Sequence, residues 1–333
     1  MAKIIDAGAQ ASDEYLAKME KKVASVYSEA ASEMQKKTDK YFDGFTARDA
    51  KKQELVKAGE LSEKKYLEWR KNQMLTGQRY RDMVDVLAKD ATNADKIAMS
   101  IVNGYLPDVY ATNFNYGTYQ VEHVGSINTS FTLYDRHTVE RLIKDDPDIL
   151  PKPKVEIPKD YRWNKEHIVN QLTQGVLQGE SVKTISKRMQ KVTDMDKNAA
   201  MRNARTAVTG AQNAGRVDAY KRAEDMGIKM KQEWLAAHDG HTRESHAEVD
   251  GEQIEVGGTF SNGLAYPGDP GGAPEEVYNC RCTLMPALEK LGQIKGKENY
   301  RKSEYQNKLA EYHEDVSASK MSFSEWEKAH SKR

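Results

Sequence analysis

The sequence has only two cysteines, and it has no long uninterrupted apolar run. Two cysteines exclude a framework of several disulfides and fit a reducing compartment. Because no stretch of about 18 apolar residues occurs, no membrane-spanning helix is predicted. The first residues, Met1–Asp6, lack the apolar core of a secretory signal. We therefore expect a protein that is made in a cytoplasm and is used there, or in a particle that is assembled there.

An excess of charge of one sign is also missing. Lysine plus arginine number 51, and aspartate plus glutamate also number 51, so the net charge is zero. The chain as a whole is therefore not drawn to nucleic acid or to membranes, and any electrostatic binding must use local patches. The sequence also has no phosphate-binding loop of the Walker type and no dinucleotide fingerprint.

Charge itself is abundant, since charged residues make up 31% of the chain and hydrophobic residues only 38%. This composition favours long solvated helices with modest cores. The fold class that we predict is mainly α, with a small α+β module towards the C-terminus. The expected divisions are a helical N-terminal region (1–150), a helical block (151–228), a small α+β module (229–290) and a charged helical tail (291–333).

The N-terminal region is predicted to be a series of helices. Ser12 is a candidate N-cap, and an apolar stripe at steps of three and four residues follows it, which is typical of a helix that packs on other helices. A polar stretch at 114–134 predicts a loop or a hairpin, and a proline segment after Asp145 predicts an extended connection. The stripe consists of Leu16, Met19, Val23, Val26, Ala30 and Met34. The expected helices span 13–44, 47–57, 63–89, 94–113 and 138–144.

The central block has the clearest helical pattern. Ile168, Leu172 and Val176 recur at steps of four, Gly179 suits the end of that helix, and Ser181 suits the start of the next. A further helix, lined with alanines, is expected to open at Asp196 and to end at Met226. Four basic residues of this block are candidate contacts to DNA phosphates or to an acidic partner, and the alternative is an ordinary solvated face. They are Lys183, Lys187, Arg188 and Lys191.

The α+β module contains both cysteines and is rich in turn-forming residues. Three short strands are expected at 229–236, 253–256 and 282–285, with Trp234 facing inward. Cys280 and Cys282 flank one residue, so their side chains point to the same side of an extended segment. With His246 they offer three ligands of the kind that zinc prefers, and His241 or Asp239 is the candidate for the fourth.

Other interpretations of this cluster stay open. The two thiols could be small buried hydrophobic side chains beside a hydrogen-bonded histidine. A cysteine nucleophile with His246 as base is a second alternative, although no oxyanion glycine motif lies beside the cysteines. A third is a hydrolytic metal held by Asp239, Asp250 and Asp269. No spacing specifies a reaction, so we do not expect an enzyme.

The order of the motifs resembles the head-morphogenesis domain of the minor head proteins of tailed phages, the phage Mu protein F-like family. The resemblance covers about residues 164–285, and it lies in the order of the elements more than in any one of them. The matching elements are Arg205-Thr206, Asn213-Ala214-Gly215-Arg216, Trp234, Asp239–His246, Asp250-Gly251, Phe260, Pro267–Pro270 and Asn279-Cys280-Arg281-Cys282.

The resemblance implies a structural role in head assembly. It implies a virion protein at the portal vertex of the head, with the portal protein and the scaffold or major capsid protein as partners, no membrane partner, and a role in DNA packaging or delivery. It implies assembly in the host cytoplasm. Some relatives carry an ADP-ribosyltransferase domain after this module, for which the stretch after Met285 is expected to be too short. The alternative function is a phage DNA-handling or hydrolytic metalloenzyme.

Overall fold

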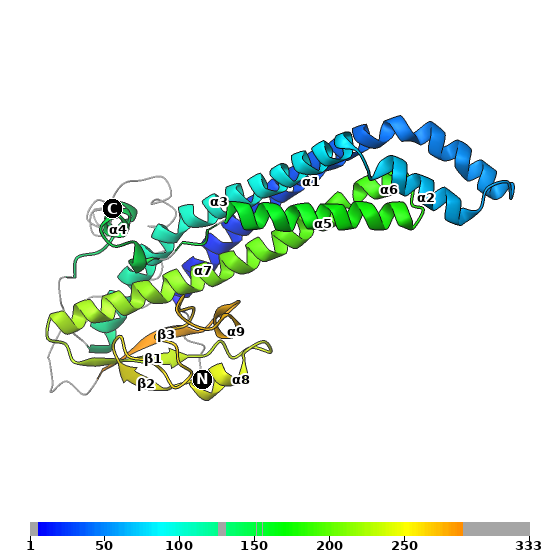
Figure 1. The fold of residues 1–333 in the computed structure, drawn as a ribbon. Coiled ribbons are helices and arrows are strands. Elements are labelled where there is room, and N and C mark those ends of the chain that lie inside the picture. Colours follow the sequence, from blue (N-terminus) through cyan, green and yellow to red (C-terminus); the bar gives the residue numbers. More distant parts are fainter. Residues whose placement is uncertain (1–5, 126–130, 151, 155, 289–333) are drawn as a thin grey trace, which may run out of the picture. The chain divides into compact units, whose positions relative to one another are not determined.

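The computed structural model describes residues 6–125, 131–150, 152–154 and 156–288. This part of the chain is mainly helical, with one small antiparallel sheet, as the sequence predicts (Figure 1). In chain order the elements are α1 (Ala7–Lys57), α2 (Glu63–Met74), α3 (Gln78–Gly125), α4 (Arg136–Asp145), the short 3₁₀ helix η1 (Pro147–Ile149), α5 (Ile157–Leu177), α6 (Val182–Lys187), α7 (Met189–Asp225), β1 (Met230–Leu235), α8 (Glu244–Glu248), β2 (Gln253–Glu255), α9 (Pro274–Val277) and β3 (Thr283–Leu288).

The packing divides the chain into two units, and each unit is built from segments that lie far apart in the sequence. Unit 1 contains residues 1–19, 102–153 and 202–333, and unit 2 contains residues 20–101 and 154–201. Helices α1, α3 and α7 contribute residues to both units. The divisions expected from the sequence followed one another along the chain, whereas these units interleave.

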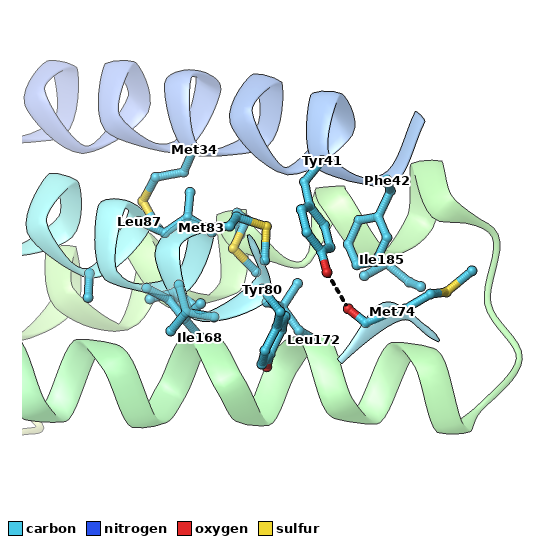
Figure 2. Packing of buried hydrophobic residues seen from close by; sticks show 14 of the residues in the cluster. Met34, Tyr41, Phe42, Met74, Tyr80, Met83, Leu87, Ile168, Leu172 and Ile185 are labelled. Carbon is cyan, nitrogen blue, oxygen red and sulfur yellow. Dashed lines mark hydrogen bonds between the residues drawn. The ribbon is translucent and has the colours of Figure 1, made fainter. Parts of the chain in front are cut away.

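Unit 2 is a helical assembly around a core of aliphatic, methionine and aromatic side chains. Figure 2 shows members of this core from α1, α2, α3, α5 and α6, including Met34, Met74, Leu87, Leu172 and Ile185. All five are fully or almost fully buried. The hydroxyl of Tyr41 donates a hydrogen bond of 2.8 Å to the carbonyl of Met74, so this phenol keeps a partner inside the core (Figure 2).

The start and end signals of two unit 2 helices are those that the sequence predicts. Ser62 caps α2 by accepting from the amide of Lys65, and Ser181 caps α6 by accepting from the amide of Thr184. Gly179 follows α5 with φ +70°, a conformation that costs glycine little. Ile168, Leu172 and Val176 of α5 are fully buried, as their spacing of four predicts.

Two polar clusters lie inside unit 2. Arg70 is buried, its Nε lies 3.0 Å from Asp49 Oδ1, and it donates to the carbonyls of Val176 and Glu180. Asp95 accepts from Tyr27 and from Asn164, and it raises the pKa of the nearby Asp196.

Asp196 is the less well satisfied of the two aspartates. It is buried, and its Oδ2 has no hydrogen-bond partner. Burial, with the charges of Asp95 and Asp160, raises its pKa from 3.8 to about 8. Asp196 is therefore neutral at moderately acidic pH.

Unit 1 is centred on a buried arginine of α7. Arg216 has no exposed side-chain surface, and its guanidinium donates to Asp6 (2.6 and 2.7 Å), to Asn113 and to the carbonyl of Leu284. It thereby joins the residue before α1, helix α3 and strand β3. Glycine permits a close helix approach beside it, because a Cβ at Gly215 would lie 2.5 Å from the carbonyl oxygen of Tyr110.

The sheet of unit 1 has the order β2-β1-β3, and both pairings are antiparallel. Gln232 of β1 pairs with Ile254 on one side and with Pro286 on the other. Trp234 is fully buried, as predicted, and its ring meets Phe260 edge-on at 5.1 Å. The sheet gives the loop-rich module its regular backbone pairing.

Several of the helix boundaries that were predicted from the sequence were wrong. The first helix begins at Ala7, where Asp6 caps it by accepting from Ala9, so Ser12 is internal, and it continues through Gly44 to Lys57. The expected loop or hairpin at 114–134 is helical up to Gly125. Its tyrosines and asparagines have weak helix propensity, but most are buried in unit 1, and this packing decides their conformation.

Two further helix boundaries differ. The single helix expected at 63–89 is divided, since α2 ends at Met74 and α3 begins at Gln78. Helix α3 then continues through residue 94, where a new helix was expected to begin, and through Pro107. Helix α7 begins at Met189, so Asp196 lies inside it and is not an N-cap. No helix of the described residues is both long and apolar enough to span a bilayer. The charged tail expected at 291–333 lies outside the described residues.

Candidate metal centre

Two segments of unit 1 bring His246, Cys280 and Cys282 together. His246 lies on the short helix α8, which follows the turn at Asp239–Thr242, and the cysteines lie on the segment that leads into β3. Asn279 adopts φ +56°, in the left-handed region that asparagine tolerates better than most residues. The chain turns there and then becomes extended, which places both thiols on one side.

The three side chains form a compact and buried donor set. Nδ1 of His246 lies 3.7 Å from Sγ of Cys280 and 3.5 Å from Sγ of Cys282. Among the described residues they are the one group of three or more His, Cys, Asp or Glu whose ligand atoms lie within 4.8 Å of one another. A tetrahedral zinc with bonds of about 2.3 Å to sulfur and about 2.0 Å to nitrogen separates those atoms by about 3.5 Å. The geometry therefore fits a metal ion.

The imidazole of His246 is held in position from its other sides. Its Nε2 lies 3.0 Å from Oε2 of Glu276, a contact outside good hydrogen-bond geometry, and the same carboxylate oxygen accepts from Ser245 at 2.8 Å. Trp234 meets the imidazole edge-on at 5.2 Å. A carboxylate behind a histidine is the arrangement that orients metal-binding imidazoles.

The two thiols interact, so they titrate as a pair. Cys282 loses the first proton, because a hydrogen bond from the Cys280 thiol and a further one from His246 lower its pKa despite its burial. The resulting thiolate and burial both raise the pKa of Cys280. The site thus stabilises one negative charge without a metal, and a second thiolate needs a cation.

Side chains of α7 hold the cysteine segment by its backbone. Thr209 donates to the carbonyl of Cys280 at 2.7 Å, and Asn213 donates to the carbonyl of Cys282 and accepts from the amide of Leu284. Next to them, Gly210 packs against Gly268, which has φ +80°. A Cβ at Gly210 would lie 2.8 Å from the carbonyl oxygen of Gly268. This contact sets how closely α7 approaches the loop.

Sequence reasoning missed Glu276 and Thr209. No spacing linked Glu276 to His246, since the two are 30 positions apart in the printed sequence. Asn213 lies in one of the motifs that carry the family resemblance, but its polar side chain on an alanine-lined helix was the one signal of its role. A buried asparagine in such a helix must bond to something outside it.

The two candidates for a fourth ligand stand outside the group of three. His241 is exposed and lines the same pocket as both cysteines. Asp239 is also exposed, and it accepts from the amide of His241 and from Arg281 at 2.9 Å. These contacts lower the pKa of Asp239. Among the described residues, neither His241 nor Asp239 places a ligand atom within 4.8 Å of all three members of the cluster.

The three aspartates of the hydrolytic-metal interpretation serve separate turns. Asp250 accepts from the amide of Ala236 and lies 3.0 Å from His238. Asp269 accepts from the amides of Ala265 and Gly271. With Asp239 bonded as above, the described residues contain no cluster of these three carboxylates.

The four basic candidates lie in unit 2 on α6 and at the start of α7. Lys183, Lys187 and Lys191 are exposed. Arg188 is buried, and it donates to both carboxylate oxygens of Glu180 at 2.6 and 2.7 Å and to Gln178 and Gln171. The expectation that Arg188 contacts DNA is therefore corrected, because its donors serve a structural network.

Two comparisons relate this chain to phage minor head proteins. Residues 166–285 match the family described as phage Mu protein F like protein, and this segment contains the His/Cys cluster and its α7 supports. Among individual proteins, the chain is 25% identical over 319 residues to the minor head protein GP7 of Bacillus phage SPP1. That match covers 88% of this chain and 96% of the SPP1 protein.

Two shorter matches connect the chain to larger or different proteins. It is 30% identical over 145 residues to the NAD(+)–arginine ADP-ribosyltransferase EFV of Enterococcus faecalis, covering 42% of this chain and 30% of that protein. It is 29% identical over 133 residues to the uncharacterized protein YqbB of Bacillus subtilis, covering 37% of this chain and 42% of that protein. No solved structure matches the chain.

Proposed function

We propose that this minor head protein acts at the portal vertex of the phage head, as a structural component of head morphogenesis and not as an enzyme. Its partners would be the portal protein and the scaffold or major capsid protein, in the host cytoplasm during assembly and in the virion afterwards. The observation that supports the role most strongly is the match to a phage minor head protein over nearly the whole of both chains. The family resemblance supports the portal location.

The portal assignment is tested with heads assembled in the presence and absence of the portal gene. We expect the full chain in purified heads only when the portal is present, and equal incorporation into portal-free heads would contradict the proposal. Removal of residues 1–60 would be a poor test, because it deletes Asp6, which pairs with the buried Arg216. Loss of incorporation could then reflect misfolding of unit 1.

We further propose that the exposed lysines of α6 and α7 contact DNA during packaging or delivery. Lys183, Lys187 and Lys191 support this because they are exposed on one short stretch. Replacing all three by glutamine should weaken DNA binding and reduce its salt dependence, since each phosphate contact releases counterions. The control replaces three other exposed lysines of unit 2, which are Lys51, Lys57 and Lys64. An equal salt dependence of DNA binding in both triple variants would mean that these three lysines are ordinary solvated side chains and do not contact DNA.

We propose that the His246, Cys280 and Cys282 cluster holds a structural zinc ion, with His241 or a ligand from the pocket in the fourth position. The support is the donor set, its burial and the sulfur–nitrogen separations. A metal would supply rigidity to a glycine-rich loop region, and His246, Cys280 and Cys282 would hold it there.

The zinc proposal is tested by metal analysis of the purified full chain. We expect about one zinc per chain, lost in Cys280→Ser and kept in the control His238→Ala, whose histidine lies outside the cluster. A His241→Ala variant that loses zinc would assign the fourth ligand. Metal-free protein whose melting is unchanged by a chelator would leave the two cysteines as buried core residues.

A further inference from the structure

The metal centre adjoins a pocket of unit 1 with a volume of 560 Å³. Cys280 and Cys282 line it, together with residues from the start of α1, from α7 and from the turn before α8. Volumes of about 300–1,000 Å³ are typical of pockets that hold small molecules. Neither the head role nor the proposed zinc accounts for a cavity of this size.

The charged side chains of the pocket are mainly arginines. Arg205 of α7, Arg243 before α8 and Arg281 between the cysteines all line it, against a single lining carboxylate, Asp13. His241 and Asn279 are among the uncharged polar residues that also line the pocket. Three arginines from separate segments therefore line one concave space, although the chain as a whole has no net charge.

Two of the arginines are held in position by the surrounding fold. Arg281 donates to Asp239 at 2.9 Å, and Arg243 donates to the carbonyl of Tyr278. Each of these contacts uses one nitrogen of a guanidinium group that carries five N–H donors in a planar fork. Each of the two guanidinium groups therefore has further N–H donors for a ligand.

The one carboxylate that lines the pocket, Asp13, has a raised pKa, and an arginine of the pocket acts on it. The pKa of Asp13 is raised by burial and by Asp6, and Arg281 opposes the rise. The charge of Arg281 therefore acts on a residue that lines the pocket.

We propose that this pocket binds a small oxyanionic ligand of the phosphate class, held by Arg205, Arg243 and Arg281. Guanidinium forks match the oxygens of a phosphate group in pairs, which is why arginine predominates at such sites. A concave pocket suits a free phosphate or a nucleoside phosphate. The backbone of a DNA duplex would instead need an open strip of cations along its length.

The test uses the full chain and three probes, which are inorganic phosphate, adenosine monophosphate and a short DNA duplex. Binding is measured by titration calorimetry, and by thermal unfolding against sodium chloride at equal ionic strength, since a ligand that binds the folded state raises its melting temperature. We expect both small probes to bind, and Arg205→Gln to weaken them roughly tenfold, the usual effect of losing a charged hydrogen bond.

The matched control is Arg222→Gln, an exposed arginine of the same helix that does not line the pocket. It should bind phosphate as the unmodified chain does. Because Arg205 is exposed, its replacement is not expected to unfold the protein, and circular dichroism checks this. Arg205→Lys keeps the charge but not the fork, so it should retain only part of the affinity.

The same titrations are repeated after chelation of metal and in Cys280→Ser, which separates this proposal from the zinc proposal. Phosphate binding that survives chelation and depends on Arg205 supports the pocket whether or not zinc is present. Binding that disappears with the metal and is indifferent to Arg205→Gln would overturn it. So would a duplex that binds through Arg205 while the small probes do not, or equal binding by Arg205→Gln and Arg222→Gln.

Discussion

The two units differ in what fills their interiors. Unit 2 packs methionine, aliphatic and aromatic side chains from six helices, and Arg70 and the Asp95 cluster are polar exceptions within it. In unit 1, polar side chains of α7 contact the backbone of irregular segments, as Thr209 and Asn213 do. Helices satisfy their own backbone groups, but loops depend on outside partners. A loop-rich module therefore needs buried polar residues at specific positions.

The largest expected effect is on Arg216 of unit 1. Arg216→Met should lower the free energy of unfolding by about 3–5 kcal/mol, because it leaves the carboxylate of Asp6 and the carbonyl of Leu284 without their cation. Urea unfolding of the full chain measures this, with the exposed Arg222→Met on the same helix as control. Equal stability of the two variants would mean that unit 1 does not rely on this buried charge.

The corresponding test in unit 2 removes apolar contacts. Leu172 is fully buried, so Leu172→Ala should cost about 2–5 kcal/mol through lost burial and the cavity that remains. Leu177, on the same helix, is 45% exposed, and Leu177→Ala should have little effect. Hydrogen exchange would locate the change in peptides of unit 2, and a similar loss in both variants would contradict the assignment of the core.

A smaller loss is expected from Asn213, which tests the polar support of the metal centre. Asn213→Ala leaves the carbonyl of Cys282 and the amide of Leu284 without these partners, at about 1–3 kcal/mol. Gln190→Ala, an exposed amide elsewhere on α7, is the control. If calorimetric melting showed the same stability for both, the comparison between the units would lose its main support.

The last prediction concerns the free energy of unfolding of unit 2, which should change by a small amount for each pH unit. The pKa of Asp196 is raised from 3.8 to about 8 by burial and by neighbouring aspartates, so the folded state holds a proton that the unfolded state releases. Stability should therefore fall as pH rises between these values, by up to about 1.4 kcal/mol per pH unit from this group. Asp196→Asn should flatten that slope, whereas Asp194→Asn, at an exposed ion pair, should not. Urea midpoints across this pH range decide it.

Sequence patterns predicted the parts of the fold that depend on periodicity and on caps. The spacing of Ile168, Leu172 and Val176, the cap at Ser181 and the inward Trp234 are all confirmed. Where a helix runs through glycine, serine or proline, local signals mislead. Gly44 and Pro107 both lie inside helices, because the tertiary packing of their neighbours outweighs propensity.

The candidate site was predictable by residue type and not by geometry. The two cysteines of the chain lie two positions apart in the same module as His246, which is why these three residues could be singled out. The roles of Glu276 and Thr209 required the fold, because each acts on a residue that is remote in sequence. Arg188 shows the reverse case, since a basic residue in a basic stretch turned out to be structural.

The contact between Gly210 and Gly268 has a genetic consequence. A single added methyl group at Gly210 would meet the carbonyl oxygen of Gly268 at 2.8 Å, between two stretches of main chain that cannot easily separate. The strain falls on the main chain beside Thr209 and Asn213, which hold the cysteine segment. Gly210→Ala is therefore the substitution of choice for a conditional allele, with heads that assemble in the cold and fail on warming, which would time the protein's requirement during phage growth.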